Sequence, residues 1–284
     1  MGSHSYNSTK ASLRSTMYQG QSVDTIFAQA KKRRVHESMD PKAIRLRECR
    51  DSDVHPMTFP IMFSLDVTGS MGRIPAMLIQ SELPTLVKGI IDSGVTSPQI
   101  LFLGIGDQYS DDAPLQVGQF EGGDEQMELW LKNTWLEGNG GSNAHESYLL
   151  SWYFAANHTA TDAFDKRGKK GLLITVGDEA SHGSIDSSIM NKIMDISVEG
   201  TLTDKVLLAQ AQEKWECYHL HVMEGNWGPR TLGYWKDLMG ENCIEVSSYK
   251  NIPKIVAELA IKHGQVAQTQ TQTQTQTSHH SIML

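Results

Sequence analysis

Alternating strand-like and helix-like patterns run through the middle of the chain. Short apolar runs typical of buried strands occur near residues 60–66, 99–106, 114–120, 171–177, 216–223 and 242–247. Helix-period patterns lie near residues 72–93, 124–134, 146–160, 184–197, 203–215, 231–239 and 251–263. Strands that alternate with helices are typical of a mostly parallel sheet covered on both faces. The pattern therefore predicts an α/β fold, with a turn-rich edge hairpin near 106–118.

The two ends of the chain differ from this middle part. We expect one α/β domain over residues 41–264, in which 41–58 is a lead-in segment. Residues 1–40 have no clear place in that domain and are expected to form a basic, partly disordered arm. Gln and Thr alternate almost perfectly over 267–277. Such a repeat has no apolar face for a core, so we expect residues 265–284 to be a disordered tail.

Charge is divided unevenly between the arm and the domain. Residues 1–50 hold ten Lys/Arg and four Asp/Glu, a net charge of +6, whereas the remaining chain carries 15 and 29, a net charge of −14. A basic arm of this kind docks on its own acidic domain, on an acidic partner or on nucleic acid. The basic run at 31–34 is short and poor in aromatic residues, so nucleic acid is the least favoured of these partners.

The lengths of the apolar runs and the number of cysteines indicate in which cellular compartment the protein is found. No apolar run approaches the ~20 residues needed to span a bilayer, and we expect neither a membrane segment nor a signal region. The chain has three cysteines, Cys49, Cys217 and Cys243. An odd, sparse set argues against a disulfide framework and favours a reducing compartment. We therefore expect a cytoplasmic protein.

The most informative stretch is residues 61–72, IMFSLDVTGSMG. A buried strand ends in Asp66, and two hydroxyl residues follow at alternate positions, Thr68 and Ser70. Oxygens at i, i+2 and i+4 on a loop leaving a strand can converge on one point. One carboxylate with two hydroxyls is a hard-oxygen set, which suits Mg²⁺ or Mn²⁺ better than zinc.

This pattern resembles the Asp-x-Ser/Thr-x-Ser signature of the metal-ion-dependent adhesion site in von Willebrand factor type A (vWA) domains. The family needs a hydroxyl from a second loop and an aspartate from a third. The loop GNGGSNAHES at 138–147 offers Ser142, or Asn143 if the register slips by one, and the strand over 171–177 ends in Gly177-Asp178. The three elements occur in the family's order over a domain-sized length.

The resemblance implies a fold and a function. The fold is a doubly wound six-stranded sheet with one antiparallel edge strand and sites outside the carboxyl ends of the strands. Thr68, Ser70 and Ser142 would touch the metal directly, while Asp66 and Asp178 would act mainly through water. The cation would then bind a Glu or Asp of a partner protein. The motif forms look closer to bacterial or phage-encoded members than to animal matrix proteins, and such prokaryotic members often serve as adaptors or co-chaperones beside AAA+ ATPases.

Other residues near these loops suggest alternatives. Asp107, Glu146, Glu179 and His182 are expected at the rim of the site, and a metal-dependent hydrolase would use Asp178, Glu179 and His182. A structural assembly component tethered through the tail is a further alternative. We expect no enzymatic activity, because the acidic and histidine residues lack a spacing signature.

For two further clusters of residues we favour a structural role over a metal site. Asp107, Asp111 and Asp112 are expected to form a solvated acidic turn rather than a second cation site. Cys217, His219 and His221 alternate and so share one strand face, as part of a zinc set would. A packed strand with hydrogen-bonded histidines is the favoured interpretation.

Overall fold

The structure is a computed structural model that describes residues 4–18, 21–27, 29, 32–138 and 144–264. Its centre is a six-stranded sheet with the order β12–β11–β7–β2–β3–β4. All neighbouring pairs are parallel except β3 and β4, which are antiparallel. The strands are β2 Phe59–Asp66, β3 Pro98–Ile105, β4 Leu115–Val117, β7 Gly171–Gly177, β11 Trp215–Val222 and β12 Cys243–Val246. The predicted α/β class and mostly parallel sheet are confirmed, and the expected tail over 265–284 lies outside the described residues.

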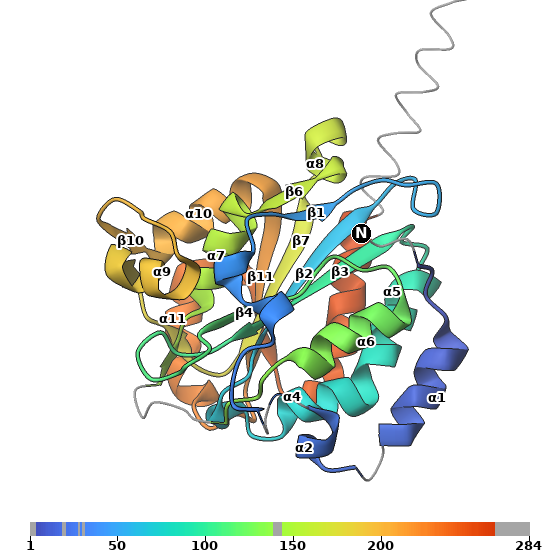
Figure 1. Ribbon diagram of the computed structural model, residues 1–284, viewed down its shortest axis with the longest axis horizontal. Helices are drawn as coiled ribbons and strands as arrows, with labels where there is room; N and C mark the ends of the chain where they lie inside the picture. Colours follow the sequence, from blue (N-terminus) through green and yellow to red (C-terminus); the bar gives the residue numbers. More distant parts are fainter. Residues whose placement is uncertain (1–3, 19–20, 28, 30–31, 139–143, 265–284) are drawn as a thin grey trace, which may run out of the picture.

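Helices cover both faces of this sheet (Figure 1). Side chains alternate along β2, so Ile61, Phe63 and Leu65 pack in one apolar core while Met62 packs in the other. The first core lies under α4 Ile74–Met77, α5 Leu83–Asp92, α6 Asp124–Asn133 and a helix over 252–264. The second lies under α7 Tyr148–Asn157, α9 Ser187–Met194, α10 Asp204–Lys214 and α11 Gly228–Met239. Burial on both faces explains why the central strands are continuous apolar runs.

The helix predicted over 72–93 is divided into pieces. A π-helical turn, Leu78–Glu82, separates α4 from α5. Pro75 lies in the first turn of α4 and Pro84 in the first turn of α5. Proline has no N–H for the preceding turn and its ring crowds that turn's carbonyl, so each is tolerated only where a helix begins. The predicted helix 184–197 also begins late, because Ser184–Asp186 forms β9, antiparallel to β10 Thr201–Thr203.

Short elements frame the sheet. In the lead-in segment, β1 Arg47–Cys49 pairs in parallel with β6 Thr159–Thr161, ahead of α8 Asp162–Arg167. Arg50 fixes this corner through ion pairs to Asp162 and Asp165 at 2.9 and 2.8 Å. Above the strand ends, β5 His145–Glu146 pairs with β8 Ala180–Ser181. The remaining elements are α2 Val23–Ile26 and the single turns Glu37–Met39, Pro41–Ala43, Gly69–Met71, Gly240–Asn242 and Tyr249–Asn251.

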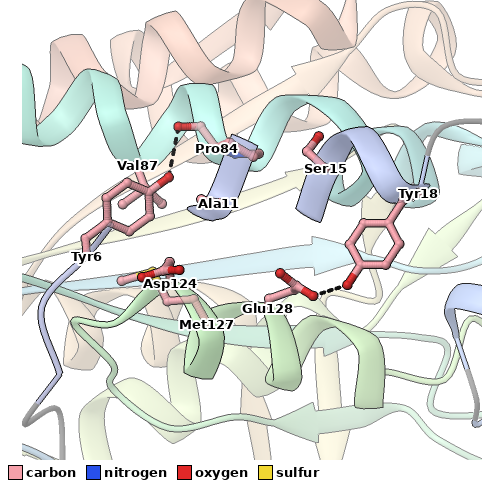
Figure 2. A pocket seen from close by; sticks show the side chains of 9 residues that line it. All are labelled: Tyr6, Ala11, Ser15, Tyr18, Pro84, Val87, Asp124, Met127 and Glu128. Carbon is pink, nitrogen blue, oxygen red and sulfur yellow. Dashed lines mark hydrogen bonds between the residues drawn. The ribbon is translucent and has the colours of Figure 1, made fainter. Parts of the chain in front are cut away.

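The N-terminal helix α1, Ser8–Tyr18, packs on the outer surface of α5 and α6. Arg14 reaches across to Asp124 and Glu128, the latter at 2.6 Å. Figure 2 shows the hydroxyls of Tyr6 and Tyr18 on either side of a small cavity, directed at Pro84 and Glu128. Ala11 is the buried residue of α1. The basic arm therefore contacts its own acidic domain, mainly through polar side chains.

None of the helices in the described ranges combines the length and apolar character needed to cross a membrane.

Candidate metal centre

The candidate site lies at the carboxyl ends of β2 and β7. These strands are neighbours in the sheet, yet the chain leaves β2 for β3 on one side and later returns to β7 on the other. Ligands of open α/β sheets bind outside the strand ends at such a switch point. Asp66 ends β2, and Asp178 directly follows the last residue of β7. Both aspartates are fully buried.

A chain of hydrogen bonds joins the two aspartates through the hydroxyl residues of the first loop. Asp66 Oδ1 accepts from Thr68 N at 2.9 Å and from Thr68 Oγ1 at 2.7 Å. Ser70 Oγ donates to Asp178 Oδ1 at 2.7 Å. Between these bonds, Thr68 Oγ1 and Ser70 Oγ lie 3.2 Å apart. The structure thus brings together four of the five predicted ligands from two separate strands.

The hydroxyl oxygens of Thr68 and Ser70 face each other at the centre of this series of hydrogen bonds. A hydroxyl carries one proton and two lone pairs. The Thr68 hydroxyl donates a hydrogen bond to Asp66, and the Ser70 hydroxyl donates one to Asp178. The 3.2 Å contact between the two hydroxyl oxygens, in which either can donate, links these bonds into one chain. The two hydroxyls therefore lie next to each other between two buried aspartates.

The other oxygens of both aspartates are held by residues that the sequence motifs did not indicate. Tyr148 donates its hydroxyl to Asp66 Oδ2 at 2.9 Å, and the backbone N–H of Trp227 donates to Asp178 Oδ2 at 2.9 Å. Thr231 Oγ1 donates to the carbonyl of Asp178 at 2.6 Å. These contacts fix the orientation of each carboxylate, so its first oxygen points at a hydroxyl of the loop.

Gly177 makes room for the Tyr148 contact. A Cβ at this position would overlap the Tyr148 hydroxyl and approach Asp66 Cβ to 3.0 Å. Only glycine at position 177 therefore allows the Tyr148 side chain, at the start of α7, to pack against the end of β7. A glycine inside a buried strand often marks such a close approach, and this was the one signal in the sequence for Tyr148.

Two further carboxylates, Glu146 and Glu179, lie beside these aspartates, with exposed fractions of 0% and 1%. Both oxygens of Glu146 and Oε2 of Glu179 are buried and accept no hydrogen bond from an N–H or hydroxyl group. The two carboxyls instead lie against each other, and Glu179 also lies beside Ser70. Burial, and next the charge of Asp178, raise the pKa of Asp66 to about 8. Burial also raises the pKa of Glu146, reinforced by Asp66 and Glu179, and burial raises the pKa of Glu179. The buried position therefore disfavours the ionised forms of these carboxyls.

Two of the predicted rim residues, Asp107 and His182, contact each other. His182 Nε2 lies 2.8 Å from Asp107 Oδ1. The rings of Tyr109 and His145 pack on His182, with centroids 4.9 and 5.6 Å away. The expected solvated acidic turn is wrong for Asp107 and also for Asp111, which are 0% and 6% exposed. Their carboxylates instead accept hydrogen bonds from the backbone of their own loop, which folds inward.

Two of the predicted residues, Ser142 and Asn143, lie outside the described residues. Within the described ranges, no three His, Cys, Asp or Glu side chains gather in a way that could hold a metal ion. The arrangement at β2 and β7 is instead built on hydroxyls.

The partial zinc set on β11 is a closed hydrogen-bonded network. His221 Nε2 lies 2.7 Å from the carbonyl of Gly228, which can only accept, so this nitrogen carries the proton. His221 Nδ1 then accepts from His219 Nε2 at 3.2 Å, and His219 Nδ1 accepts from Thr175 Oγ1 at 2.9 Å. Burial lowers the pKa of both histidines, which keeps them neutral. The packed-strand interpretation is confirmed.

Comparisons with known proteins concern the fold. No family model and no curated protein sequence matches the chain. Among solved structures, the pilus adhesin SpaC from Lactobacillus rhamnosus GG is similar with a TM-score of 0.51 and 11% identity, over 77% of this chain and 32% of that chain. This chain thus spans about a third of the adhesin's length.

Two other solved structures are similar at lower TM-scores. Proximal thread matrix protein 1 from the mussel byssus has a TM-score of 0.47 and 12% identity, over 75% of this chain and 48% of that chain. An aerotolerance-related membrane protein from Bacteroides fragilis has a TM-score of 0.43 and 10% identity, over 72% of this chain and 99% of that chain. The likeness to SpaC supports the α/β fold and nothing finer.

Proposed function

We propose that the chain is a vWA-type module that binds a protein partner through Mg²⁺ or Mn²⁺. The observation that carries this proposal is the hydrogen-bonded chain from Asp66 through Thr68 and Ser70 to Asp178, at the switch point of the sheet. The sequence motif and the strand-end geometry support the same site independently. Ser142, outside the described residues, is the proposed ligand from the second loop.

The residues present fit a hard divalent cation. Two hydroxyl oxygens face each other 3.2 Å apart, and each has lone pairs that a cation at a common point could bind. The buried carboxylates on either side supply the negative charge that such a cation neutralises. Burying ionised carboxylates without a counter-charge costs several kcal/mol each, so a cation would also relieve the electrostatic cost of the fold.

The chain's own residues would control how strongly the site attracts a partner. A bound cation supplies a positive centre that can accept a Glu or Asp side chain from another protein. Tyr148 and Trp227 hold one oxygen of each aspartate, which favours contact through hydroxyls over direct carboxylate contact. Neutral ligands leave more of the cation's charge for the partner, and charge-assisted bonds are strongest where solvent is excluded.

Partner class and location rest on the sequence resemblance. We propose a cytoplasmic adaptor of bacterial or phage type, with an AAA+ ATPase system as the first partner class to test. The structural assembly alternative predicts oligomers that persist without metal. Sedimentation with Mg²⁺ and with EDTA separates these two proposals.

One observation favours a metal-dependent hydrolase as the second candidate. Glu179 is a buried carboxyl with a raised pKa next to Asp178, and perturbed carboxyls of this kind are frequent in active sites. His182, the other residue of that hypothesis, is engaged by Asp107. Turnover that survives purification and is lost in Glu179→Gln would favour the hydrolase over the adaptor.

The test of the metal site is a double substitution. Asp66→Ala with Ser70→Ala removes one carboxylate and one hydroxyl from the chain, and we expect Mg²⁺ binding to disappear in calorimetry while the domain still folds. Ser64→Ala is the matched control, because Ser64 is another buried hydroxyl on β2 that bonds Ser151 at 2.6 Å instead of the site. Equal Mg²⁺ affinity in the double variant and the parent would refute the assignment.

A further inference from the structure

A cavity lies between the turn Pro41–Ala43, the segment 108–115 and α9. Its volume is ≈ 150 Å³. One water molecule needs about 10–15 Å³ of such space, so the cavity has room for a ligand of roughly ten non-hydrogen atoms. None of the residues that line it is a proposed metal ligand, so the cavity is separate from the site of Asp66 and Asp178.

One buried carboxylate oxygen on the wall of this cavity has no partner. Asp111 lines the cavity and is 6% exposed. Its Oδ2 accepts from the backbone N–H of Asp107 at 2.8 Å, and its own N–H donates to the carbonyl of Asp107 at 3.0 Å. These bonds fix the side chain, while Oδ1 accepts no hydrogen bond in the described part of the chain. Because roughly 90% or more of buried polar groups in native proteins are paired, Oδ1 indicates a ligand that donates a hydrogen bond.

The remaining wall combines charged groups with apolar surface. Lys42 lies in the turn Pro41–Ala43 and Lys192 lies on α9. Both lysines are exposed, and neither takes part in an ion pair among the described residues. Asp40, which accepts from the Lys42 N–H at 3.0 Å, and the exposed Asp112 also line the cavity. The buried apolar residues of the wall are Pro41, Ala113, Pro114, Leu115 and Ile193.

The charges of these groups indicate the class of ligand. Burial raises the pKa of Asp111 to about 6, so at pH 8 its carboxylate is ionised and pairs best with a donor that carries positive charge. The two lysines would repel a ligand that is only a cation, and Asp111 would repel one that is only an anion. A ligand with both an ammonium and a carboxylate group satisfies all three residues. The apolar wall suits a hydrocarbon side chain on the same ligand.

We infer that this cavity binds a free α-amino acid with an apolar side chain, such as leucine. The ammonium group donates to Asp111 Oδ1, and the carboxylate pairs with Lys42 or Lys192. The hydrocarbon side chain packs on Pro114 and Ile193. The inference goes beyond the proposed function and does not depend on a metal ion.

The experiment measures leucine binding to the full chain by saturation-transfer difference NMR, at pH 8 in metal-free buffer. Two matched probes each lack one charged group of leucine: isoamylamine has no carboxylate, and isocaproate has no ammonium group. We expect leucine to bind about tenfold or more tightly than either probe, because each probe loses one hydrogen-bonded contact between charged groups.

Two variants remove the proposed contacts from the protein side. Asp111→Asn keeps an oxygen for the Asp107 N–H but places an amide NH₂ where the ammonium group would bind. Lys42→Met with Lys192→Met removes both positive charges and keeps side chains of similar length. Each variant should weaken leucine binding about tenfold or more, while the melting temperature reports whether the domain still folds.

The controls change exposed residues outside the cavity: Asp53→Asn, and Lys205→Met with Lys250→Met. Both should bind leucine as the parent does. Leucine affinity equal to the parent's in either cavity variant overturns the inference, and so does an absence of leucine binding, which would leave only water in the cavity. Isoamylamine that binds as tightly as leucine also overturns it. If Asp111→Asn does not fold, the lysine variant and the two probes decide. Because the assay contains no metal, failure of the proposed function leaves this result unchanged.

Discussion

Arg14→Ala should release α1 from the domain without unfolding the rest. The Arg14 side chain is 21% exposed and pairs with Asp124 and Glu128, whose side chains are 6% and 13% exposed. Breaking a buried pair costs about 3–5 kcal/mol, whereas exposed pairs contribute about 0–1 kcal/mol. We expect the loss of these partly buried ion pairs to cost about 2 kcal/mol in the stability of α1 docking. The cost is below that of a fully buried pair because Glu128 still accepts a hydrogen bond from Tyr18 and Asp124 still accepts one from the Asn7 N–H.

The assay is hydrogen exchange of the peptide covering α1. A loss of about 2 kcal/mol corresponds to exchange about 30-fold faster over Ser8–Tyr18. Exchange over α10, a helix of the same length on the opposite face, should not change. Lys10→Ala is the matched control on the same helix, because Lys10 reaches Glu125 only at 4.0 Å with both side chains more than 60% exposed. Equal protection of α1 in Arg14→Ala and Lys10→Ala would refute this reasoning.

Two other predictions concern the buried carboxylates. With its pKa raised from about 4 to about 8, Asp66 holds its proton more tightly in the folded state. Its contribution to stability is therefore complete below pH ~4 and is lost as the pH rises toward 8. Without metal, the melting temperature should fall over this window, and both saturating Mg²⁺ and Asp66→Asn should flatten the slope; an unchanged slope in Asp66→Asn would contradict the assignment. Tyr148→Phe removes a buried donor to Asp66 and should cost about 1–2 kcal/mol in urea unfolding, whereas Tyr109→Phe, on a residue 64% exposed, should cost little; equal costs would contradict the role of Tyr148.

The fold was largely predictable because its strongest signals are local. The apolar runs that form β2 and β7 are visible in the sequence, and their boundaries agree with the structure to within one residue. The pairing of Asp66, Thr68 and Ser70 followed from their spacing on one loop. The joining of this loop to Asp178 followed from the rule that parallel strand ends meet at one edge.

Contacts between distant segments were not predictable in the same way. Tyr148 and Asp66 are 82 residues apart, and nothing in an apolar helix marks one tyrosine as a donor. The Trp227 contact uses a backbone N–H, which carries no residue signature. The docking of α1 depends on contacts of Arg14 with Asp124 and Glu128, which lie 110 and 114 positions further along the chain. Each depends on the assembled fold, which hydrophobic periodicity alone does not specify.

The fit of Tyr148 over Gly177 has a consequence for evolutionary variation. Because the hydroxyl occupies the space of a Cβ at position 177, neither position can change freely while the other is kept. A homologue with alanine or serine at 177 needs a smaller side chain at 148 and another donor for Asp66. In an alignment of related chains, these two columns should therefore covary with each other more strongly than with their neighbours in sequence. Such covariation would identify the relatives that retain the same support beneath the first aspartate.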